Sequence, residues 1–171
     1  MLEVGPFARP VGSHTVRRIA HPTDLTSASD NALAWAGYLA QASNAELLLL
    51  HVVPPPTPIF ETESPEKSRA ELELSLLLTQ AKLKGLRARG FVLCGSGSID
   101  RQILKAARLE RVDMIVMGTS GRTGLSRLFV GSVASRVISR ASCPVFIIPS
   151  RLAEQANISV SDTISDTHGG H

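Results

Sequence analysis

The residues with the clearest chemical potential form a glycine pattern in the second half of the chain. Gly118-x2-Gly121 is followed, after nine intervening residues, by Gly131-Ser132. Glycine carries no Cβ, so a ligand can approach its backbone closely. If Gly131-Ser132 opens a helix, the free N–H groups and positive dipole end there favour an anion such as phosphate. The pattern predicts a phosphate-binding loop, with a glycine-built turn that holds no ligand as the alternative.

Two other phosphate-binding patterns are missing from the sequence. No Gly-x4-Gly-Lys-Ser/Thr loop is present, so a P-loop mechanism has no lysine for the phosphates. No Gly-x-Gly-x-x-Gly follows the first expected strand, which disfavours a nicotinamide-dependent dehydrogenase. Backbone N–H groups and small hydroxyl side chains are therefore the expected phosphate donors.

Asp24 is a second candidate, because it stands directly after a short expected strand. A carboxylate there can accept hydrogen bonds from ligand hydroxyls, or it can cap the helix that follows. The residue types alone leave both roles open. His21 and His51 lie on strands expected to be neighbours, but two imidazoles are more often polar core residues than a metal site. We therefore assign no metal ligand and no catalytic residue.

Short apolar runs alternate with longer amphipathic stretches between residues 16 and 150. We expect strands at residues 17–21, 46–53, 86–94, 112–117 and 145–148, and helices at residues 26–42, 64–84, about 98–107 and 132–140. Ser27 and Asp30 resemble a capping pair at the start of the first helix. Gly85 is the expected stop of the second helix.

This alternation predicts the fold class. Strands separated by helices pair in parallel through right-handed crossovers. The expectation is an α/β protein, a single doubly wound five-stranded parallel sheet with helices on both faces, of Rossmann-like architecture. Ligands of such sheets bind beyond the carboxyl ends of the strands, where the strand order reverses. Asp24 and Gly118 both stand at expected strand ends.

Length and composition limit the function classes. The chain has 171 residues, enough for one domain, and its 43% hydrophobic content excludes wholesale disorder. The net charge of +3 comes from scattered residues and aromatics are only 4%, so nucleic acid is not an expected partner. No apolar run is long enough to span a bilayer, no signal-peptide core is visible, and two cysteines make no disulfide framework. We expect a cytoplasmic protein without a membrane partner.

The same residues resemble a known family. Gly118-x2-Gly121-x9-Gly131-Ser132 resembles the ATP-binding signature of the universal stress protein family. The segments 112–118, 143–145, 22–24 and 50–53 are also similar to that family, in the right order. The resemblance covers residues 16–149 and implies the adenine nucleotide alpha hydrolase-like form of the fold. We expect a flexible arm at residues 1–15, a nucleotide-binding domain at 16–150 and a mobile polar tail at 151–171.

The resemblance also implies roles for single residues in nucleotide binding. The residue matching Asp24 contacts the ribose, the one matching Val52 holds adenine through its backbone, and the one matching Gly118 lies against the ribose. The residues matching Gly121, Gly131 and Ser132 bind the phosphates, often together with Mg²⁺ or Mn²⁺. Where His21 stands, family members often have a small or aliphatic residue.

The expected function is that of an ATP- or adenine-nucleotide-binding stress-response regulatory protein, with slow ATP hydrolysis at most. No general base stands near the expected phosphate loop, so rapid turnover is not expected. The resemblance also implies a homodimer through the last strand, Val145–Ile148, which is apolar throughout. The alternative function is a dimeric interaction module of the same fold that binds partners and no nucleotide.

Overall fold

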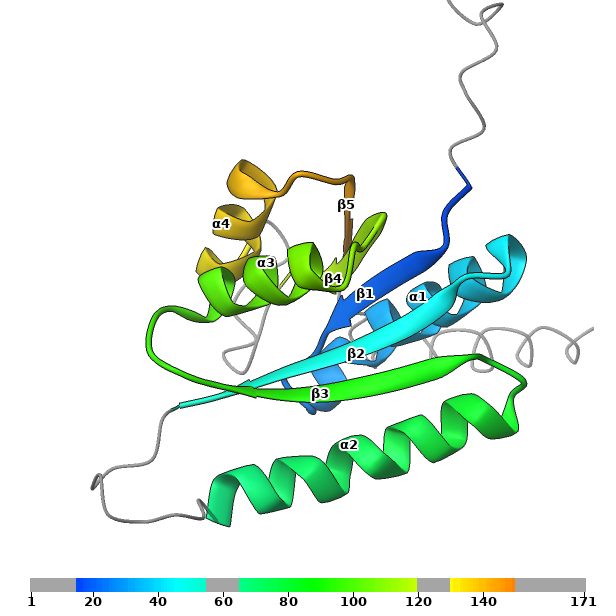
Figure 1. Cartoon of the computed structure of the whole chain (residues 1–171), viewed down its shortest axis with the longest axis horizontal. Coiled ribbons are helices and arrows are strands. Elements are labelled where there is room, and N and C mark those ends of the chain that lie inside the picture. Colours follow the sequence, from blue (N-terminus) through cyan, green and yellow to red (C-terminus); the bar gives the residue numbers. More distant parts are fainter. Residues whose placement is uncertain (1–14, 55–64, 120–129, 150–171) are drawn as a thin grey trace, which may run out of the picture.

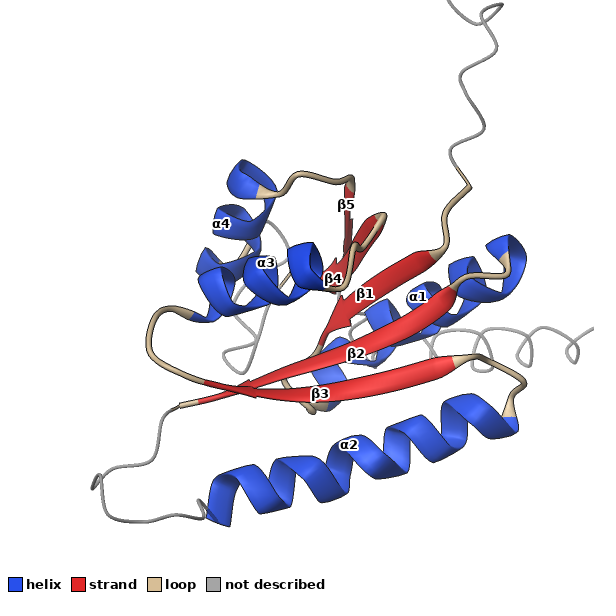
Figure 2. Ribbon diagram, viewed as in Figure 1, coloured by secondary structure: helices blue, strands red, loops and turns tan. Residues whose placement is uncertain are grey.

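The computed structural model describes residues 15–54, 65–119 and 130–149 (Figure 1). Within these ranges the strands and helices alternate along the chain (Figure 2). The strands are β1 (Arg18–Pro22), β2 (Glu46–Val53), β3 (Ala88–Cys94), β4 (Met114–Gly118) and β5 (Val145–Ile148). The helices are α1 (Asp30–Ser43), α2 (Pro65–Leu83), α3 (Ile99–Leu109) and α4 (Ser132–Arg140), and a 3₁₀ turn, η2 (Ser27–Ser29), precedes α1.

The strands form one parallel sheet in the order β3-β2-β1-β4-β5. Ile19 of β1 lies beside Leu47 of β2 on one side and beside Met114 of β4 on the other. Along the chain, β2 and then β3 are added on one side of β1, and β4 and β5 are added on its other side. The order therefore reverses between β1 and β4, and the predicted fold class is confirmed.

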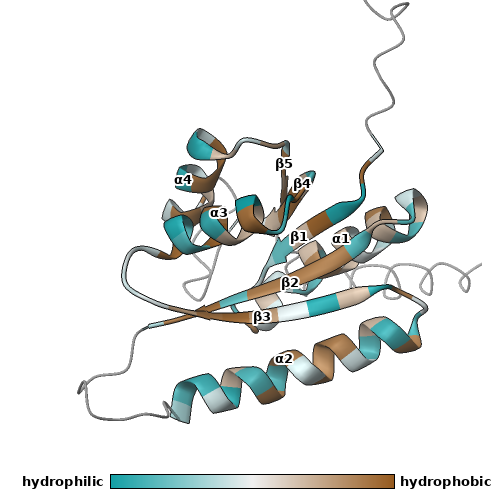
Figure 3. Ribbon diagram, in the orientation of Figure 1, coloured by the Kyte–Doolittle hydropathy of each residue, from teal (hydrophilic) through white to brown (hydrophobic). Residues whose placement is uncertain are grey.

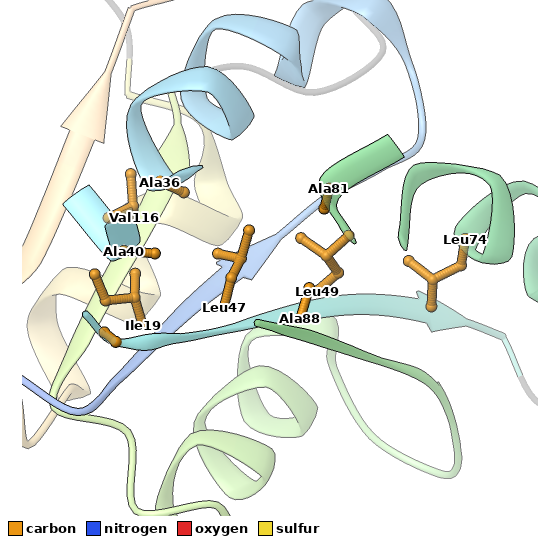
Figure 4. Packing of buried hydrophobic residues seen from close by; sticks show 10 residues of the cluster. Ile19, Ala36, Ala40, Leu47, Leu49, Leu74, Ala81, Ala88 and Val116 are labelled. Atoms are coloured by element: carbon orange, nitrogen blue, oxygen red, sulfur yellow. The ribbon is translucent and has the colours of Figure 1, made fainter. Parts of the chain in front are cut away.

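Helices cover both faces of the sheet. On one face α1 and α2 pack through Ala36, Ala40 and Leu74 against the first four strands, β1 to β4 (Figure 4). On the other face α3 and α4 pack through Leu104 and Val137. Each side chain from Leu47 to Leu50 is no more than 1% exposed. A strand buried on both faces has to be apolar at successive positions, and residues 47–50 of β2 are four leucines in succession (Figure 3).

The start of α1 differs from the expected one. Residues 27–29 form the 3₁₀ turn, α1 begins at Asp30, and neither Ser29 nor Thr26 caps its helix through a side-chain hydrogen bond. The predicted Ser27–Asp30 capping pair is therefore wrong. The Ser29 hydroxyl instead donates to the Thr26 carbonyl and lies 2.9 Å from Thr23 Oγ1. The Ser29 hydroxyl is therefore used for hydrogen bonds within the loop and does not cap α1.

The boundaries of the remaining elements are close to the expected ones. Gly85 has a φ of +80° and follows the end of α2, as predicted for a helix stop. β3 begins at Ala88, two residues later than expected, because Leu86 N–H donates to Ala81 O and still belongs to the end of α2. No helix in the described ranges is long and apolar enough to cross a membrane.

Candidate functional site

The carboxyl ends of β1, β2 and β4 border a cleft of about 770 Å³. The cleft lies where the strand order reverses, between β1 and β4, which is the usual ligand position in doubly wound sheets. The start of α4 lines one side of the cleft, and residues near the starts of α2 and α3 line its other sides. The described residues that the sequence assigned to the site all line this cleft: Asp24, Val52, Gly118, Gly131 and Ser132. Gly121, the sixth, lies outside the described residues.

Asp24 is held in the cleft wall by the loop that follows it. Its Oδ1 accepts hydrogen bonds from the backbone N–H and the hydroxyl of Thr26, at 3.1 and 2.8 Å. Its Oδ2 is buried and accepts no hydrogen bond from the described residues. Asp24 thus stabilises the turn before α1 without being the N-cap of α1, which is Ser29. One carboxylate oxygen is left over for a ligand.

The loop carrying Asp24 is tied to the end of β2. The Thr23 N–H donates to Leu50 O at 2.9 Å, and the Thr23 carbonyl is 2.9 Å from His51 Nδ1. Because a carbonyl can only accept, His51 donates from Nδ1. Leu25, next to Asp24, has a φ of +61°, a conformation that L-residues seldom adopt. Two strand ends and one strained turn therefore determine where the Asp24 carboxylate lies.

His21 and His51 do not form a pair. His21 lies beside Leu49 in the sheet, and its Nδ1 donates to Val116 O on β4 at 2.9 Å. His51 instead binds the carbonyl of Thr23. His21 is fully buried, and its Nε2 finds no hydrogen-bond partner in the described part of the chain. Desolvation outweighs the Val116 hydrogen bond and the nearby Asp24 charge, and lowers the pKa of His21 from 6.5 to about 4.

The other end of the cleft is formed by the end of β4 and the start of α4. Gly118 ends β4, the Thr119 N–H donates to Ile148 O at 3.1 Å, and the Gly131 N–H donates to Thr119 O at 2.6 Å. These bonds place Gly131 at the N-cap of α4. The first hydrogen bond inside the helix runs from the Ser135 N–H to Gly131 O. The N–H groups of residues 132–134 therefore have no acceptor inside the helix. Such N–H groups, with the helix dipole, attract phosphate.

The contribution of α2 to the cleft was not predicted from the sequence. Glu66, Arg69 and Glu73 line the cleft from the first half of α2, and the Arg69 Nε donates to Glu73 Oε1 at 2.8 Å. This hydrogen bond and ion pair raise the pKa of Arg69. Their spacing puts the three residues on one helix face, but nothing in the local sequence shows what that face meets. Only the packing of α2 against β2 and β3 brings it to the cleft.

The sheet order and the cleft define a doubly wound α/β domain with a ligand site at its switch point. The model of the universal stress protein family matches residues 15–149, so the chain belongs to that family. A universal stress protein of Methanocaldococcus jannaschii is 32% identical over 145 residues, covering 80% of this chain and 84% of the relative. One of Thermus aquaticus is 35% identical over 136 residues, covering 73% of this chain and 93% of the relative.

Solved structures of the family show the same fold. The universal stress protein of Archaeoglobus fulgidus in complex with dAMP superposes with a TM-score of 0.62 at 23% identity, covering 78% of this chain and 98% of that one. A universal stress protein in complex with cAMP superposes with a TM-score of 0.60 at 24% identity, covering 80% and 99%.

Proposed function

We propose that this chain binds ATP or a related adenine nucleotide in the cleft and acts as a nucleotide-dependent regulatory protein of the stress response. The observation that carries the proposal is the convergence of two features in one cleft. Among the described residues, one oxygen of the Asp24 carboxylate has no donor, and the first N–H groups of α4 have no acceptor. The cleft volume of about 770 Å³ is in the usual range for small-molecule sites.

Each residue has a role that suits its chemistry. Asp24 accepts hydrogen bonds from the ribose, and the backbone of Val52 reads the edge of the adenine. Gly118 lies against the ribose without excluding it. The phosphates, with Mg²⁺ or Mn²⁺, are assigned to Gly131 and Ser132, together with Gly121 outside the described residues. The metal supplies charge compensation for the phosphates when it is bound.

The relatives support an adenine nucleotide as the ligand. The two structures that share the fold hold dAMP and cAMP. Binding rather than rapid turnover is the activity we propose, with slow hydrolysis at most. The described residues at the phosphate end, from Gly118 to Thr119 and from Gly131 to Val133, include no carboxylate or imidazole that would serve as a general base.

The direct test is to purify the protein without added nucleotide and to denature it. The released compounds are then identified by chromatography and mass spectrometry. Titration of the emptied protein with ATP and Mg²⁺ in a calorimeter follows. We expect either released adenine nucleotide or saturable binding of one ATP per chain. Neither release nor saturable binding would contradict the proposal and favour the interaction module.

The interaction module is the second candidate, and the free edge of the sheet favours it. β5 is the outermost of the described strands, beyond β4, and none of them pairs with its other edge. Phe146, in the middle of β5, is 44% exposed, so β5 presents an aromatic side chain at the surface. We propose that Val145–Ile148 pairs with the same strand of a second copy. The same dimer is compatible with nucleotide binding.

Phe146→Glu is expected to convert such a dimer into a monomer, because it places charge on both partners at a symmetric contact. Size-exclusion chromatography with light scattering measures this. Ile138→Glu is the matched control, since Ile138 is similarly exposed, at 47%, but lies on α4. A Phe146→Glu variant that keeps the mass of the wild-type dimer would contradict the β5 interface.

We also propose a cytoplasmic location and the division into an arm at residues 1–15, the nucleotide-binding domain at 16–150 and a tail at 151–171. The family match at residues 15–149 supports the middle unit.

A further inference from the structure

A buried carboxylate joins the two helices that border the phosphate end of the cleft. Asp100 is in the first turn of α3, and its side chain is fully buried. Arg140 of α4 lies with Nη1 3.2 Å from Asp100 Oδ2, and Arg136 of α4 lies with Nη1 3.6 Å from Oδ1. Both arginine side chains are about half exposed and remain in contact with solvent, whereas the Asp100 carboxylate is shielded from it. The contact is an ion-pair clamp between α3 and α4.

The clamp is charged under ordinary conditions. Burial by itself raises the pKa of Asp100, because water stabilises the ionised form. The Ser98 hydroxyl, the backbone N–H of Asp100 and the two arginines act in the opposite direction and leave the pKa below its ordinary value. The site therefore holds a carboxylate that depends on the arginines of α4, and removal of either partner leaves a buried polar group poorly satisfied.

The clamp lies close to the proposed phosphate donors. Arg136 follows Ser132 by one helical turn and Arg140 follows it by two, so all three lie along one side of α4. Ile99 and Ile103 of α3 line the cleft together with Ser132 and Val133 of α4. A shift of α4 along α3 would move the free N–H groups of its first turn relative to the strand ends.

One backbone hydrogen bond, from the Gly131 N–H to Thr119 O, also holds the start of α4 near the end of β4. Ala134 and Val137 are buried against the sheet and determine which face of α4 is inward. The hydrophobic effect that buries these two side chains is not directional. The ion pair is directional, and it links α4 to the first turn of α3 at two successive turns.

We propose that Asp100 is a positioning residue: through Arg136 and Arg140 it holds the start of α4 where Gly131 and Ser132 meet the nucleotide's phosphates. This inference rests on the proposed function. It concerns the phosphates alone, since Asp24 and Val52 at the other end of the cleft belong to β1, β2 and their loops.

The test compares ATP with adenosine in wild type and Asp100→Asn, which keeps the shape of the side chain and removes its charge. We expect ATP affinity to fall about tenfold, because the N–H groups at the start of α4 are then less precisely placed for the phosphates. Adenosine has no phosphates, so its affinity should stay within about twofold. Arg140→Gln should behave like Asp100→Asn. Arg101→Gln is the control, since Arg101 is an exposed arginine of α3 outside the clamp.

A second readout needs no nucleotide. Hydrogen exchange at the amides of Ser135 and Val137 in α4 is expected to rise at least about fivefold in Asp100→Asn, with no change in α1, because local opening follows the loss of local contacts. Equal losses of ATP and adenosine affinity, or unchanged ATP affinity with unchanged exchange, would overturn the proposal. If the wild-type protein binds no nucleotide at all, the proposed function fails. The exchange result then still decides whether Asp100 positions α4.

Discussion

Replacement of Asp24 by alanine is expected to weaken ATP binding by roughly 10- to 100-fold, because a hydrogen bond to a charged group contributes about 1.5–3 kcal/mol. The affinity for inorganic triphosphate should stay within about twofold, since the phosphates are assigned to the start of α4. Asp24 lines the cleft, and its Oδ2 has no donor among the described residues. Isothermal titration with ATP and with triphosphate, both with Mg²⁺, measures the two effects.

Two variants separate ligand binding from loop structure. Asp24→Asn keeps an oxygen that can accept from Thr26 N–H and Oγ1, the two bonds that hold the turn. We expect it to retain the wild-type fold by circular dichroism and still to lose much of the ATP affinity. Asp30→Ala removes an exposed carboxylate six residues further along, at the start of α1, and should change neither affinity. Equal losses for ATP and triphosphate in Asp24→Ala would show that Asp24 acts only on the loop.

Acid is expected to destabilise the protein through His21. Burial lowers the pKa of this imidazole from 6.5 to about 4, so the folded protein binds its proton less readily than the unfolded chain does. The neutral ring therefore contributes its full stability above pH 6.5, and this contribution is lost as the pH falls towards 4. At about 1.4 kcal/mol per pKa unit, the loss amounts to about 3 kcal/mol.

His21→Leu should flatten this part of the pH profile, because leucine has no proton to bind. Urea unfolding at pH 7.0, 6.0, 5.0 and 4.0 gives the free energy of unfolding for each variant. Leu49→Val is the control, since Leu49 is the sheet neighbour of His21 and the change costs about 1 kcal/mol without a titrating group. We expect that variant to keep the wild-type slope. A His21→Leu profile parallel to that of the wild type would show that other groups cause the acid sensitivity.

Much of the fold and part of the site could be predicted from the sequence. The alternation of apolar runs with amphipathic stretches depends on neighbouring residues, and it predicted the parallel doubly wound sheet. Asp24 and Gly118 were expected at strand ends and Gly131 at the start of a helix, and the structure places all three in one cleft. The capping pair at Ser27 and Asp30 was wrong, because the hydroxyl groups around it bind within a loop instead.

The tertiary structure decided what depends on distant residues. The sequence by itself determined the fold class and the residue types at the strand ends, because periodicity and turn chemistry are local. It did not show that His21 would bind Val116 across 95 residues, that Asp100 would meet Arg140 across 40, or that the charged face of α2 would line the cleft. These contacts depend on which strand lies next to which and on how each helix packs. Local patterns do not encode that packing, because many arrangements bury the same apolar faces.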